Sequence, residues 1–445
     1  MTIITIIGFI EIRYNLSGIK RKPIQISIDQ DGNVQDEELL EGVTILRPMK
    51  GIDPDLEKCL ESCLLQNYPR HKFQVLFCVE DPNDESVSIA RKIIDKYKDI
   101  DCELLIDSAN YGPNPKINNL AKGYQRAKYD IVWVLDSNVW VNPGTLVRSV
   151  VSLKKSLNNG QLTTDKPVGL IHHVPIVINE NDDCPLGAKL DEMFLLTSHA
   201  KFYCFFNRIM VEPCVNGKSN LYRRSDIDQS VSKISKGEIS LTKQDNSLDA
   251  SNFIKKGEGL RFFSRYIGED NMIGIGLWLN NGRQAMTGDV CIQPMTNNVK
   301  YSINDYVRRR VRWLRVRKYM VLAATLVEPT TESIFIGILG SYGISTLFLT
   351  GKYFWLLFII HEIYWCFIDY IQYSTIIKFA NVDELSKMSN SIKINKDLEI
   401  TKWLPIWILR EFLAFPIWVI AMCGGTIDWR NKPFNIKSDL SAEEL

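Results

Sequence analysis

Residues 131–138, IVWVLDSN, consist of five apolar residues followed directly by Asp136, Ser137 and Asn138. A short, continuous apolar run that ends in turn-forming residues is typical of a strand buried on both faces of a parallel sheet. In open α/β sheets, ligands bind beyond the carboxyl ends of the strands. We therefore expect the carboxylate of Asp136 to lie at the open edge of such a sheet, where a ligand binds.

Similar runs on either side extend this pattern from residue 42 to about residue 175. Apolar, β-branched runs predict further strands, and apolar residues spaced three and four apart predict helices between them. The predicted strands are GVTILRP (42–48), FQVLFCVED (73–81), CELLID (102–107) and VGLIHHVPIV (168–177), and two predicted helices are DLEKCLESCLLQ (55–66) and ESVSIARKIIDKY (85–97). The alternation indicates an α/β fold with a mostly parallel, Rossmann-like sheet flanked by helices.

Composition and motifs exclude several classes of protein. The 53 Lys and Arg residues are balanced by 52 Asp and Glu residues, which argues against a surface built to bind nucleic acid. The basic residues are concentrated locally, in RRRVRWLRVRKYM (308–320). Neither GxGxxG nor GxxxxGK[ST] occurs, so a dinucleotide site and a P-loop lose support. The ten cysteines include no CxxC pair, which favours reduced, buried thiols over a zinc site.

Three apolar segments follow the basic run. They are SIFIGILGSYGISTLFL (333–349), YFWLLFIIHEIYWCFIDY (353–370) and WLPIWILREFLAFPIWVIAM (403–422). Each is near the lower limit of the roughly 20 residues that cross a bilayer, and the last two contain ionisable residues. These segments therefore indicate a membrane-embedded part, and both spanning and interfacial orientations stay open.

The patterns divide the chain into four regions. We expect a remnant of an N-terminal anchor with a basic linker (1–41), a cytosolic catalytic domain (42–318), membrane-associated helices (319–430) and a polar C-terminal tail (431–445). Within the catalytic domain, residues 228–259 are rich in Ser, Lys, Asp, Asn and Gly and lack a sustained apolar period. This composition predicts a disordered surface insertion.

Acidic residues at the predicted strand and helix ends are candidates for chemistry. Asp81 follows a predicted strand, and Asp270 opens the apolar segment GEDNMIGIGLWL. Acids at a helix start either stabilise the helix dipole or, as we consider for Asp270, act as a general base. Mg²⁺ binds one or two carboxylates together with substrate phosphates, so Asp136 is a candidate ligand for Mg²⁺ or Mn²⁺.

Eight motifs together resemble those of the ceramide glucosyltransferase family. They are LRPMKGIDPDLEKCLESCLLQNYP (46–69), FCVEDPND (77–84), NPKINNLAKGYQRAKYD (114–130), WVLDSN (133–138), TSHAKFY (197–203), CVNGKSNLYRR (214–224), GEDNM (268–272) and RRVRW (309–313). The resemblance runs from about residue 42 to residue 429. It implies a metal-dependent, inverting enzyme of sphingolipid metabolism, with a GT-A-type fold and C-terminal membrane helices, that transfers glucose from UDP-glucose to the primary hydroxyl of ceramide.

The family's three aspartates fall on Asp81, Asp136 and Asp270 of this sequence. The resemblance implies that Asp81 contacts the uridine, that Asp136 binds the diphosphate through Mg²⁺ or Mn²⁺, and that Asp270 is the base. Lys116 and His199 also fall on family motifs, and we expect both side chains near the donor.

The family's (Q/R)xxRW motif falls on Arg309, Arg312 and Trp313. These residues are spaced i, i+3 and i+4, so on a helix they share one face. Two guanidinium groups on that face could bind one diphosphate while the indole packs beside them.

The resemblance further implies a multi-pass protein of the Golgi or ER–Golgi membrane, with its catalytic domain facing the cytosol. Its expected partners are UDP-glucose, ceramide and the bilayer, without nucleic acid, and a homo-oligomer stays open. One alternative is a hyaluronan-like or chitin-like membrane polysaccharide synthase, which also combines acidic strand ends with an RxxRW helix. Another is a nonenzymatic membrane adaptor that uses the basic run as a lipid tether.

Overall fold

The structure is a computed structural model, and it describes residues 2–16, 40–156, 165–242, 250–298, 300–379, 399–429, 432–437 and 439–445. Its centre is a mixed sheet whose strands lie in the order β3-β2-β1-β4-β7-β6-β8-β5. The strands are β1 (Val43–Pro48), β2 (Phe73–Val79), β3 (Asp101–Ile106), β4 (Ile131–Leu135), β5 (Trp140–Val141), β6 (Val168–Asn179), β7 (Ser219–Arg223) and β8 (Arg283–Met295).

The sheet is mostly parallel, as predicted. β3, β2, β1 and β4 run parallel to one another, as do β6 and β8, whereas β7 is antiparallel to both β4 and β6, and β5 is antiparallel to β8. β2 and β4 are buried at every position, which explains their almost continuous apolar sequences. The α/β fold class and the five strands predicted from the sequence are therefore confirmed.

Helices cover both faces of the β3-β2-β1-β4 part of the sheet. One core joins these strands to α2 (Leu56–Leu64), α3 (Ser86–Lys96) and α5 (Thr145–Lys155). A second core, on the opposite face, joins them to α4 (Pro115–Arg126) and α11 (Glu269–Leu279). Alternate residues of β2 contribute to the two cores, as the two-residue period of a strand requires.

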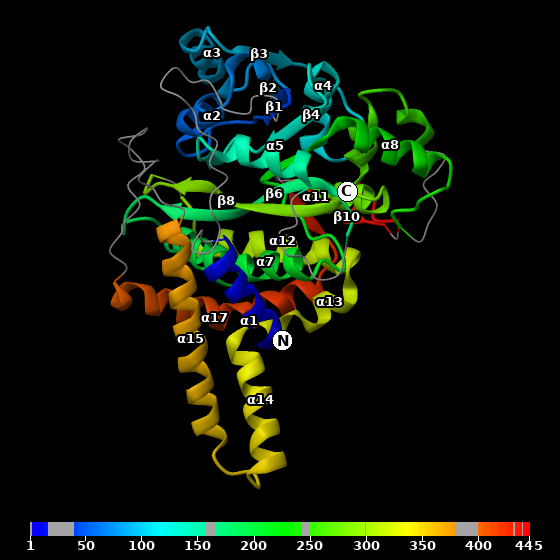
Figure 1. The fold of residues 1–445 in the computed structure, drawn as a ribbon. Coiled ribbons are helices and arrows are strands. Elements are labelled where there is room, and N and C mark those ends of the chain that lie inside the picture. Colours follow the sequence, from blue (N-terminus) through cyan, green and yellow to red (C-terminus); the bar gives the residue numbers. More distant parts are fainter. Residues whose placement is uncertain are drawn as a thin grey trace.

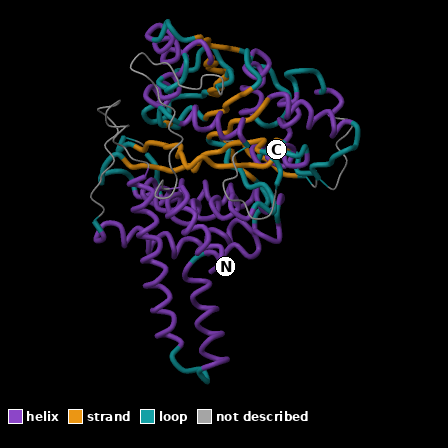
Figure 2. Tube along the Cα trace, viewed as in Figure 1, coloured by secondary structure: helices purple, strands orange, loops and turns teal. Residues whose placement is uncertain are grey.

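A further layer of helices lies beneath β6 and β8 (Figures 1 and 2). Its members are α1 (Thr2–Ile10), α6 (Leu186–Phe194), the π-helix η4 (Leu195–His199), α7 (Ala200–Ile209), α12 (Ile303–Met320), α13 (Leu322–Val327) and α17 (Ile400–Cys423). Two cores on this side of the sheet include residues of α6, α7, α12 and α17. This layer separates the sheet from the membrane-directed part of the chain.

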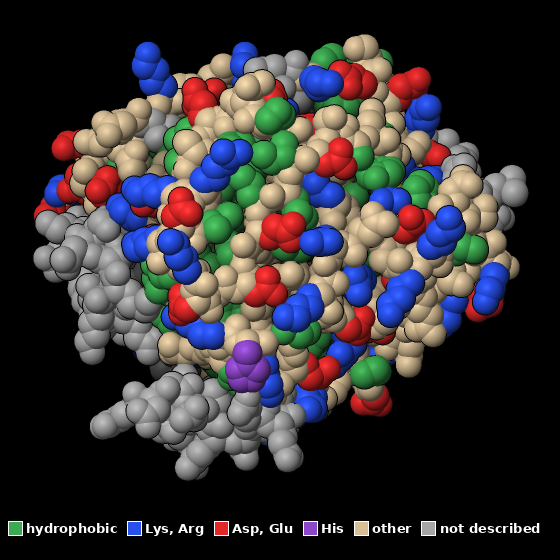
Figure 3. Space-filling model, turned by 90° about the horizontal axis from the view of Figure 1, so that it is seen from above, with side chains coloured by type: hydrophobic (Ala, Val, Ile, Leu, Met, Phe, Trp, Pro, Cys, Tyr) green, Lys and Arg blue, Asp and Glu red, His purple; other side chains and the backbone are tan. Residues whose placement is uncertain are grey.

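A helical hairpin projects from this layer, away from the sheet (Figure 1). It consists of α14 (Ser333–Phe348) and α15 (Phe354–Phe379), with large apolar side chains exposed toward its tip. By length and composition, α15 and α17 are the two described helices that could cross a membrane. The number becomes three if Leu322–Thr331 and Ser333–Phe348, which are bent by 78° relative to each other, together count as one span. The opposite end of the molecule carries interspersed Lys, Arg, Asp and Glu side chains, as expected of a surface in water (Figure 3).

The structure differs from the predicted disorder of residues 228–259. Helix α8 spans Arg224–Ser235, and Ile227, Val231 and Ile234 lie on its buried face. Three apolar residues spaced four and three apart are enough for a helix when neighbouring elements supply the rest of the core. The short helices η5 (Ser251–Phe253) and α10 (Gly259–Phe262) follow, and residues 243–249 lie outside the described chain.

The predicted polar tail also contains ordered structure. Strands β9 (Ile427–Trp429), β10 (Lys432–Ile436) and β11 (Ala442–Glu444) form a small antiparallel sheet. Phe434 and Ile436 are buried against Ile267, which lies two residues before the start of α11. Alternation of these two apolar residues within a polar segment is the signal for a half-buried strand.

Candidate active site

Asp136 follows β4 directly, and two lysines face its carboxylate. Lys116 Nζ lies 2.8 Å from Oδ1, and Lys218 Nζ lies 3.6 Å from Oδ2. The backbone N–H of Asp136 donates to the carbonyl oxygen of Lys218 at 3.0 Å, which continues the pairing of β4 with β7. About a quarter of the Asp136 side chain (24%) is exposed, so the carboxylate is held in place but open to a ligand.

Lys116 reaches Asp136 from the first turn of α4. Asn114 caps this helix, since its side-chain oxygen accepts from the backbone N–H groups of Lys116 and Ile117. The Lys116 ammonium also donates to the carbonyl oxygen of Gly217 at 2.7 Å and lies 3.3 Å from Glu269 Oε1. Burial alone would lower the pKa of Lys116, but the nearby carboxylates, Asp136 first, raise it overall. Lys116 is therefore a permanent positive charge.

Asp270 lies in the first turn of α11, and burial raises the pKa of its carboxyl to about 7. The negative charge of Glu269 adds to this rise, whereas Lys116 and the backbone N–H of Asn271, which donates at 2.9 Å, oppose it. A Cβ atom added to Gly217 would lie 3.1 Å from Asp270 Oδ2 and 3.3 Å from Lys116 Nζ, so the glycine lets both groups approach its backbone. A carboxylate with a pKa near neutrality is suited to accept a proton.

Glu269 and Asn114 were not identified from the sequence as site residues. Asn114 Nδ2 donates to Glu269 Oε2 at 2.9 Å and to the Tyr266 carbonyl oxygen at 2.7 Å, which ties the start of α4 to the start of α11. Both residues lie within motifs quoted above, NPKINNL and GEDNM, but only the fold brings these motifs together. We call Lys116, Asp136, Glu269 and Asp270 the strand-end cluster.

A second group of predicted residues gathers below β6 and β8. His199 and Trp313 are stacked, with ring centroids 5.2 Å apart and an interplanar angle of 16°. The Arg309 guanidinium lies 4.7 Å from the centroid of the Trp313 ring and pairs with the buried carboxylate of Asp191 at 2.6 Å. α12 thus holds Arg309 and Trp313 side by side, in the order that the (Q/R)xxRW spacing predicts.

His199 is held as a neutral imidazole. Burial, followed by the positive charges of Arg310 and Arg309, lowers the pKa of His199 well below its usual value. Its Nδ1 atom is buried and has no hydrogen-bond partner among the described residues. The ring can therefore stack and accept a hydrogen bond, but it does not add charge to the site.

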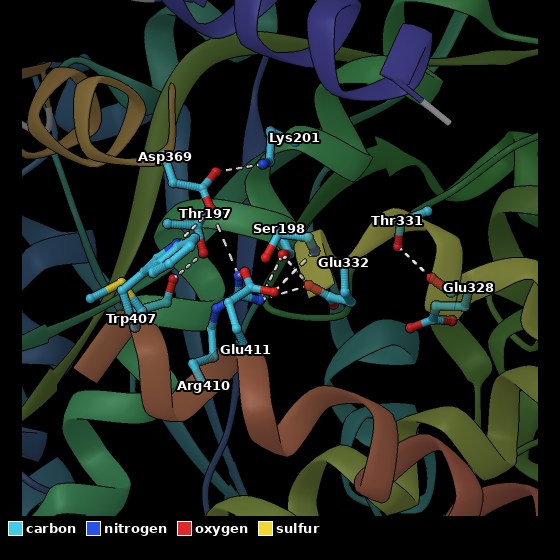
Figure 4. Close-up of polar contacts among 12 residues, drawn as sticks. Thr197, Ser198, Lys201, Glu328, Thr331, Glu332, Asp369, Trp407, Arg410 and Glu411 are labelled. Atoms are coloured by element: carbon cyan, nitrogen blue, oxygen red, sulfur yellow. Dashed lines mark hydrogen bonds and ion pairs between the residues drawn. The ribbon is translucent and has the colours of Figure 1, made fainter. Parts of the chain in front are cut away.

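Helices α15 and α17 hold the π-helix that carries His199 (Figure 4). The side-chain amide of Gln372 donates to the carbonyl oxygens of Leu196 and Thr197, each at 2.7 Å. Arg410 Nη1 donates to Ser198 Oγ at 2.8 Å and to Glu332 at 2.8 Å. π-Helical turns frequently occur at functional sites, and here the turn depends on side chains from α15 and α17.

Electrostatic effects connect the strand-end cluster with the group around His199 and Trp313. Burial lowers the pKa of Lys218 despite the opposing charge of Asp136, and Arg309 lowers it further. Burial raises the pKa of Tyr203, and the charge of Asp270 adds to this rise. The ring of Tyr203 lies 4.6 Å from that of His199. Charges of the strand-end cluster and of α12 therefore act on the same region of the protein.

Two predicted residues are less closely tied to these groups. Arg312 is partly buried on α12, one turn after Arg309. Asp81 lies in an exposed turn after β2, where its carboxylate accepts a hydrogen bond from the backbone N–H of Asn83 at 2.8 Å. Because β2 and β4 both run parallel to β1, Asp81 lies at the same sheet edge as Asp136, but the structure gives no contact between it and the cluster.

The residues at this edge fit a divalent cation only if the substrate supplies further ligands. Within the described chain, no group of three or more His, Cys, Asp or Glu residues is arranged to hold a metal ion. Asp136 offers one carboxylate, and Lys116 occupies one side of it. One carboxylate together with substrate phosphates is a common way of binding Mg²⁺, so the donor set fits a cation that arrives with a diphosphate.

Comparison with known proteins identifies a matching family and several relatives of this chain. The family model described as "Glycosyl transferase family 21" matches residues 1–230 and 248–442. A ceramide glucosyltransferase of Candida albicans is 45% identical over 520 residues, covering 98% of this chain and 94% of the relative. A ceramide glucosyltransferase of Komagataella phaffii is 46% identical over 471 residues, covering 98% and 88%. Among solved structures, a mannosyltransferase of Pyrobaculum calidifontis in complex with GDP-Man and Mn²⁺ is 14% identical, with a TM-score of 0.39 over 83% of this chain and 98% of that one.

Proposed function

The chain belongs to glycosyl transferase family 21, and from this membership we propose that it transfers glucose from UDP-glucose to the primary hydroxyl of ceramide, giving glucosylceramide. The names of the relatives at 45% and 46% identity support ceramide as the acceptor and glucose as the transferred sugar. Membership in a family of enzymes leaves no reason to retain the nonenzymatic adaptor. The observation that carries the proposal is the strand-end cluster, in which an acid with a pKa of about 7 lies beside a lysine that pairs with Asp136.

Asp270 is the base in this proposal. Its carboxylate takes the proton from the primary hydroxyl of ceramide as that oxygen forms a bond to the anomeric carbon of glucose. The bond from this carbon to the diphosphate oxygen breaks on the opposite side, so the configuration at the carbon inverts and UDP leaves. A pKa near neutrality lets Asp270 be ionised before the step and hold the proton after it.

The donor binds through the positive charges at the sheet edge and on α12. Lys116 and Lys218 lie beside Asp136, and in this proposal Arg309 and Arg312 supply two guanidinium groups from α12. Preorganised cations of this kind stabilise the charge that develops on a leaving diphosphate. A divalent cation, Mg²⁺ or Mn²⁺, would be held by Asp136 and diphosphate oxygens, and would supply further neutralisation of that charge.

The remaining predicted residues position the donor. Asp81 contacts the uridine from its turn after β2. The stacked rings of His199 and Trp313 form an apolar wall beside Arg309, which excludes water from the diphosphate side of the site. In this scheme, residues 42–318 form the catalytic domain and face the cytosol at a Golgi or ER–Golgi membrane.

An assay of membranes that contain the protein tests the function. Labelled UDP-glucose, UDP-galactose and UDP-N-acetylglucosamine are supplied in turn with ceramide, and the products are separated by thin-layer chromatography. We expect one monoglucosylated lipid with inverted anomeric configuration, loss of product after chelation of divalent cations, and product formation lowered at least about 100-fold with Asp270→Asn. A polymer, or equal use of UDP-galactose, would contradict the proposed acceptor or donor.

A further inference from the structure

Helix α17 is long and apolar enough to cross a bilayer, yet both of its ends contact the catalytic domain. Near its start, Lys402 Nζ lies 2.7 Å from the carboxylate of Asp182, which follows β6. Beyond its end, Arg315 and Lys318 of α12 donate to the carbonyl oxygens of Thr426 and Gly424 at 2.6 and 2.5 Å. A helix that crosses a membrane has its ends on opposite sides, so these contacts are incompatible with a spanning α17.

We propose that α17 does not cross the membrane and instead lies along its surface, with the catalytic domain on one side and lipid acyl chains on the other. This proposal concerns how the protein binds the membrane and does not depend on the sugar or the acceptor. The hairpin of α14 and α15 is then the element that enters the bilayer.

The exposed side chains of α17 form a stripe suited to acyl chains. Five large apolar residues recur at intervals of four, four, three and four positions, which places them on one face of the helix. They are Leu404, Ile408, Phe412, Phe415 and Val419, with exposed fractions from 36% to 66%. Exposed apolar surface of this extent, without polar residues in the stripe, matches a lipid phase better than water.

The opposite face of α17 carries the ionisable residues at the middle of the helix. Arg410 pairs with Glu332 at 2.8 Å and with Glu411, and lies 3.7 Å from Asp369, which also accepts a hydrogen bond from Trp407 (Figure 4). Asp369 also pairs with Lys201 at 2.5 Å. The basal ion network, as we call it, consists of Arg410, Glu332, Glu411, Asp369 and Lys201. Its groups face the protein interior, as charged groups at membrane depth must.

The directions of the helices agree with this orientation. α14 and α15 run away from the sheet, whereas α17 runs across the base of the molecule (Figure 1). After α17, strands β9 to β11 return to the catalytic domain, where Phe434 packs near Ile267. Both ends of α17 therefore lie on the catalytic side of the membrane surface.

The position of α17 also brings the candidate active site close to the lipid. This point rests on the function proposed above. Val311, Leu314 and Trp313 of α12 share a core with Ile417 and Ala421 of α17. Packed helices lie about 8–10 Å apart, so the helix that carries Arg309, Arg312 and Trp313 is one helix layer from the lipid. A membrane-bound acceptor can then reach the donor without leaving the bilayer.

Cysteine labelling in sealed membrane vesicles tests the side of each end. In a Cys423→Ser background, which removes the exposed native cysteine, Glu399→Cys and Thr426→Cys flank α17, and Lys92→Cys on α3 reports the catalytic side. We expect a membrane-impermeant maleimide to label all three cysteines equally without detergent. Labelling of Glu399→Cys or Thr426→Cys only after permeabilisation would overturn the proposal.

Spin labels on the stripe test its depth and its occupant. Nitroxides at Leu404→Cys, Phe412→Cys and Val419→Cys should show equal immersion and high accessibility to oxygen. In a spanning helix, Phe412 would lie about 10 Å deeper than the other two, because the helix rises ~1.5 Å per residue. Unequal depth would overturn the proposal, and so would low oxygen accessibility with spin–spin broadening, which would identify a second copy of the chain on the stripe.

Discussion

The strand-end cluster and the basal ion network contain the same kinds of side chain but differ in how completely the charges are satisfied. In the network, Asp369 accepts from Lys201 and from Trp407, and its side chain is fully buried. In the cluster, Asp270 accepts one hydrogen bond within the described chain, from the backbone N–H of Asn271, and lies next to the acidic Glu269. Asp136, one residue beyond β4, keeps a quarter of its side chain exposed.

This difference separates a reactive site from a structural one. Carboxylates whose oxygens are all engaged by cations and donors hold a fold together, and removal of one partner leaves a buried charge uncompensated. A carboxylate that burial and a neighbouring acid drive toward neutrality is suited to exchange a proton. Under the proposed function, we therefore expect the strand-end cluster to perform the chemistry and the basal ion network to fix the helices that support it.

The largest effect is expected at Asp270. Asp270→Asn should lower turnover about 100 to 10,000-fold, the usual contribution of a general base, and keep the protein folded. Because the folded-state pKa of about 7 lies above the ordinary value of 3.8, Asp270 costs stability progressively as pH rises from about 4 to about 7, and the cost is complete above pH 7. The unfolding temperature of the inactive variant, relative to the wild type, should thus rise between pH 4 and pH 7 and stay constant above pH 7.

Asp226→Asn is the matched control, since Asp226 also lies in the first turn of a helix and burial also raises its pKa. It should retain activity. Loss of activity in both variants to the same extent would mean that acids at helix starts matter here for folding alone.

The next effect is expected on α12. Arg312→Ala should reduce turnover about 100 to 1,000-fold, as removal of a group that stabilises the transition state does, with little change in thermal unfolding. Arg308→Ala, an exposed position on the same helix, should be nearly neutral. Steady-state assays with varied UDP-glucose measure both, and equal activity of the two variants would remove Arg312 from the site.

A stability effect is expected in the basal ion network. Arg410→Met should cost about 3–5 kcal/mol, because it leaves the buried carboxylates of Glu332, Glu411 and Asp369 without their common partner. Lys402→Met breaks an exposed pair with Asp182 and should cost at most about 1 kcal/mol. Denaturant unfolding in detergent measures the free energy of unfolding of both variants. Equal losses would contradict the structural role given to the basal ion network.

Patterns local in the sequence predicted much of the fold and part of the site. The apolar run that ends in Asp136 and the spacing of Arg309 and Trp313 depend only on neighbouring residues, and the structure places these residues as the patterns indicate. The family motifs also led to Lys116, which contacts Asp136.

Contacts between distant segments could not be predicted in this way. The bond between Asn114 and Glu269 joins residues 155 positions apart, and Gln372 reaches a π-helix more than 170 positions earlier. The helix at Arg224–Ser235 was missed because its few apolar residues are sufficient only against a core supplied by other elements. Hydropathy alone likewise cannot distinguish a spanning helix from α17, whose ends return to the same domain.

The central claim, that Asp270 is a base whose pKa its surroundings raise, is tested most directly by the pH dependence of kcat/KM for the donor. This ratio reports the ionisation of groups in the free enzyme. We predict activity that is constant at high pH and falls tenfold per unit below about pH 7, with the same profile for Asp226→Asn. A ratio that stays constant down to pH 5 would contradict the account.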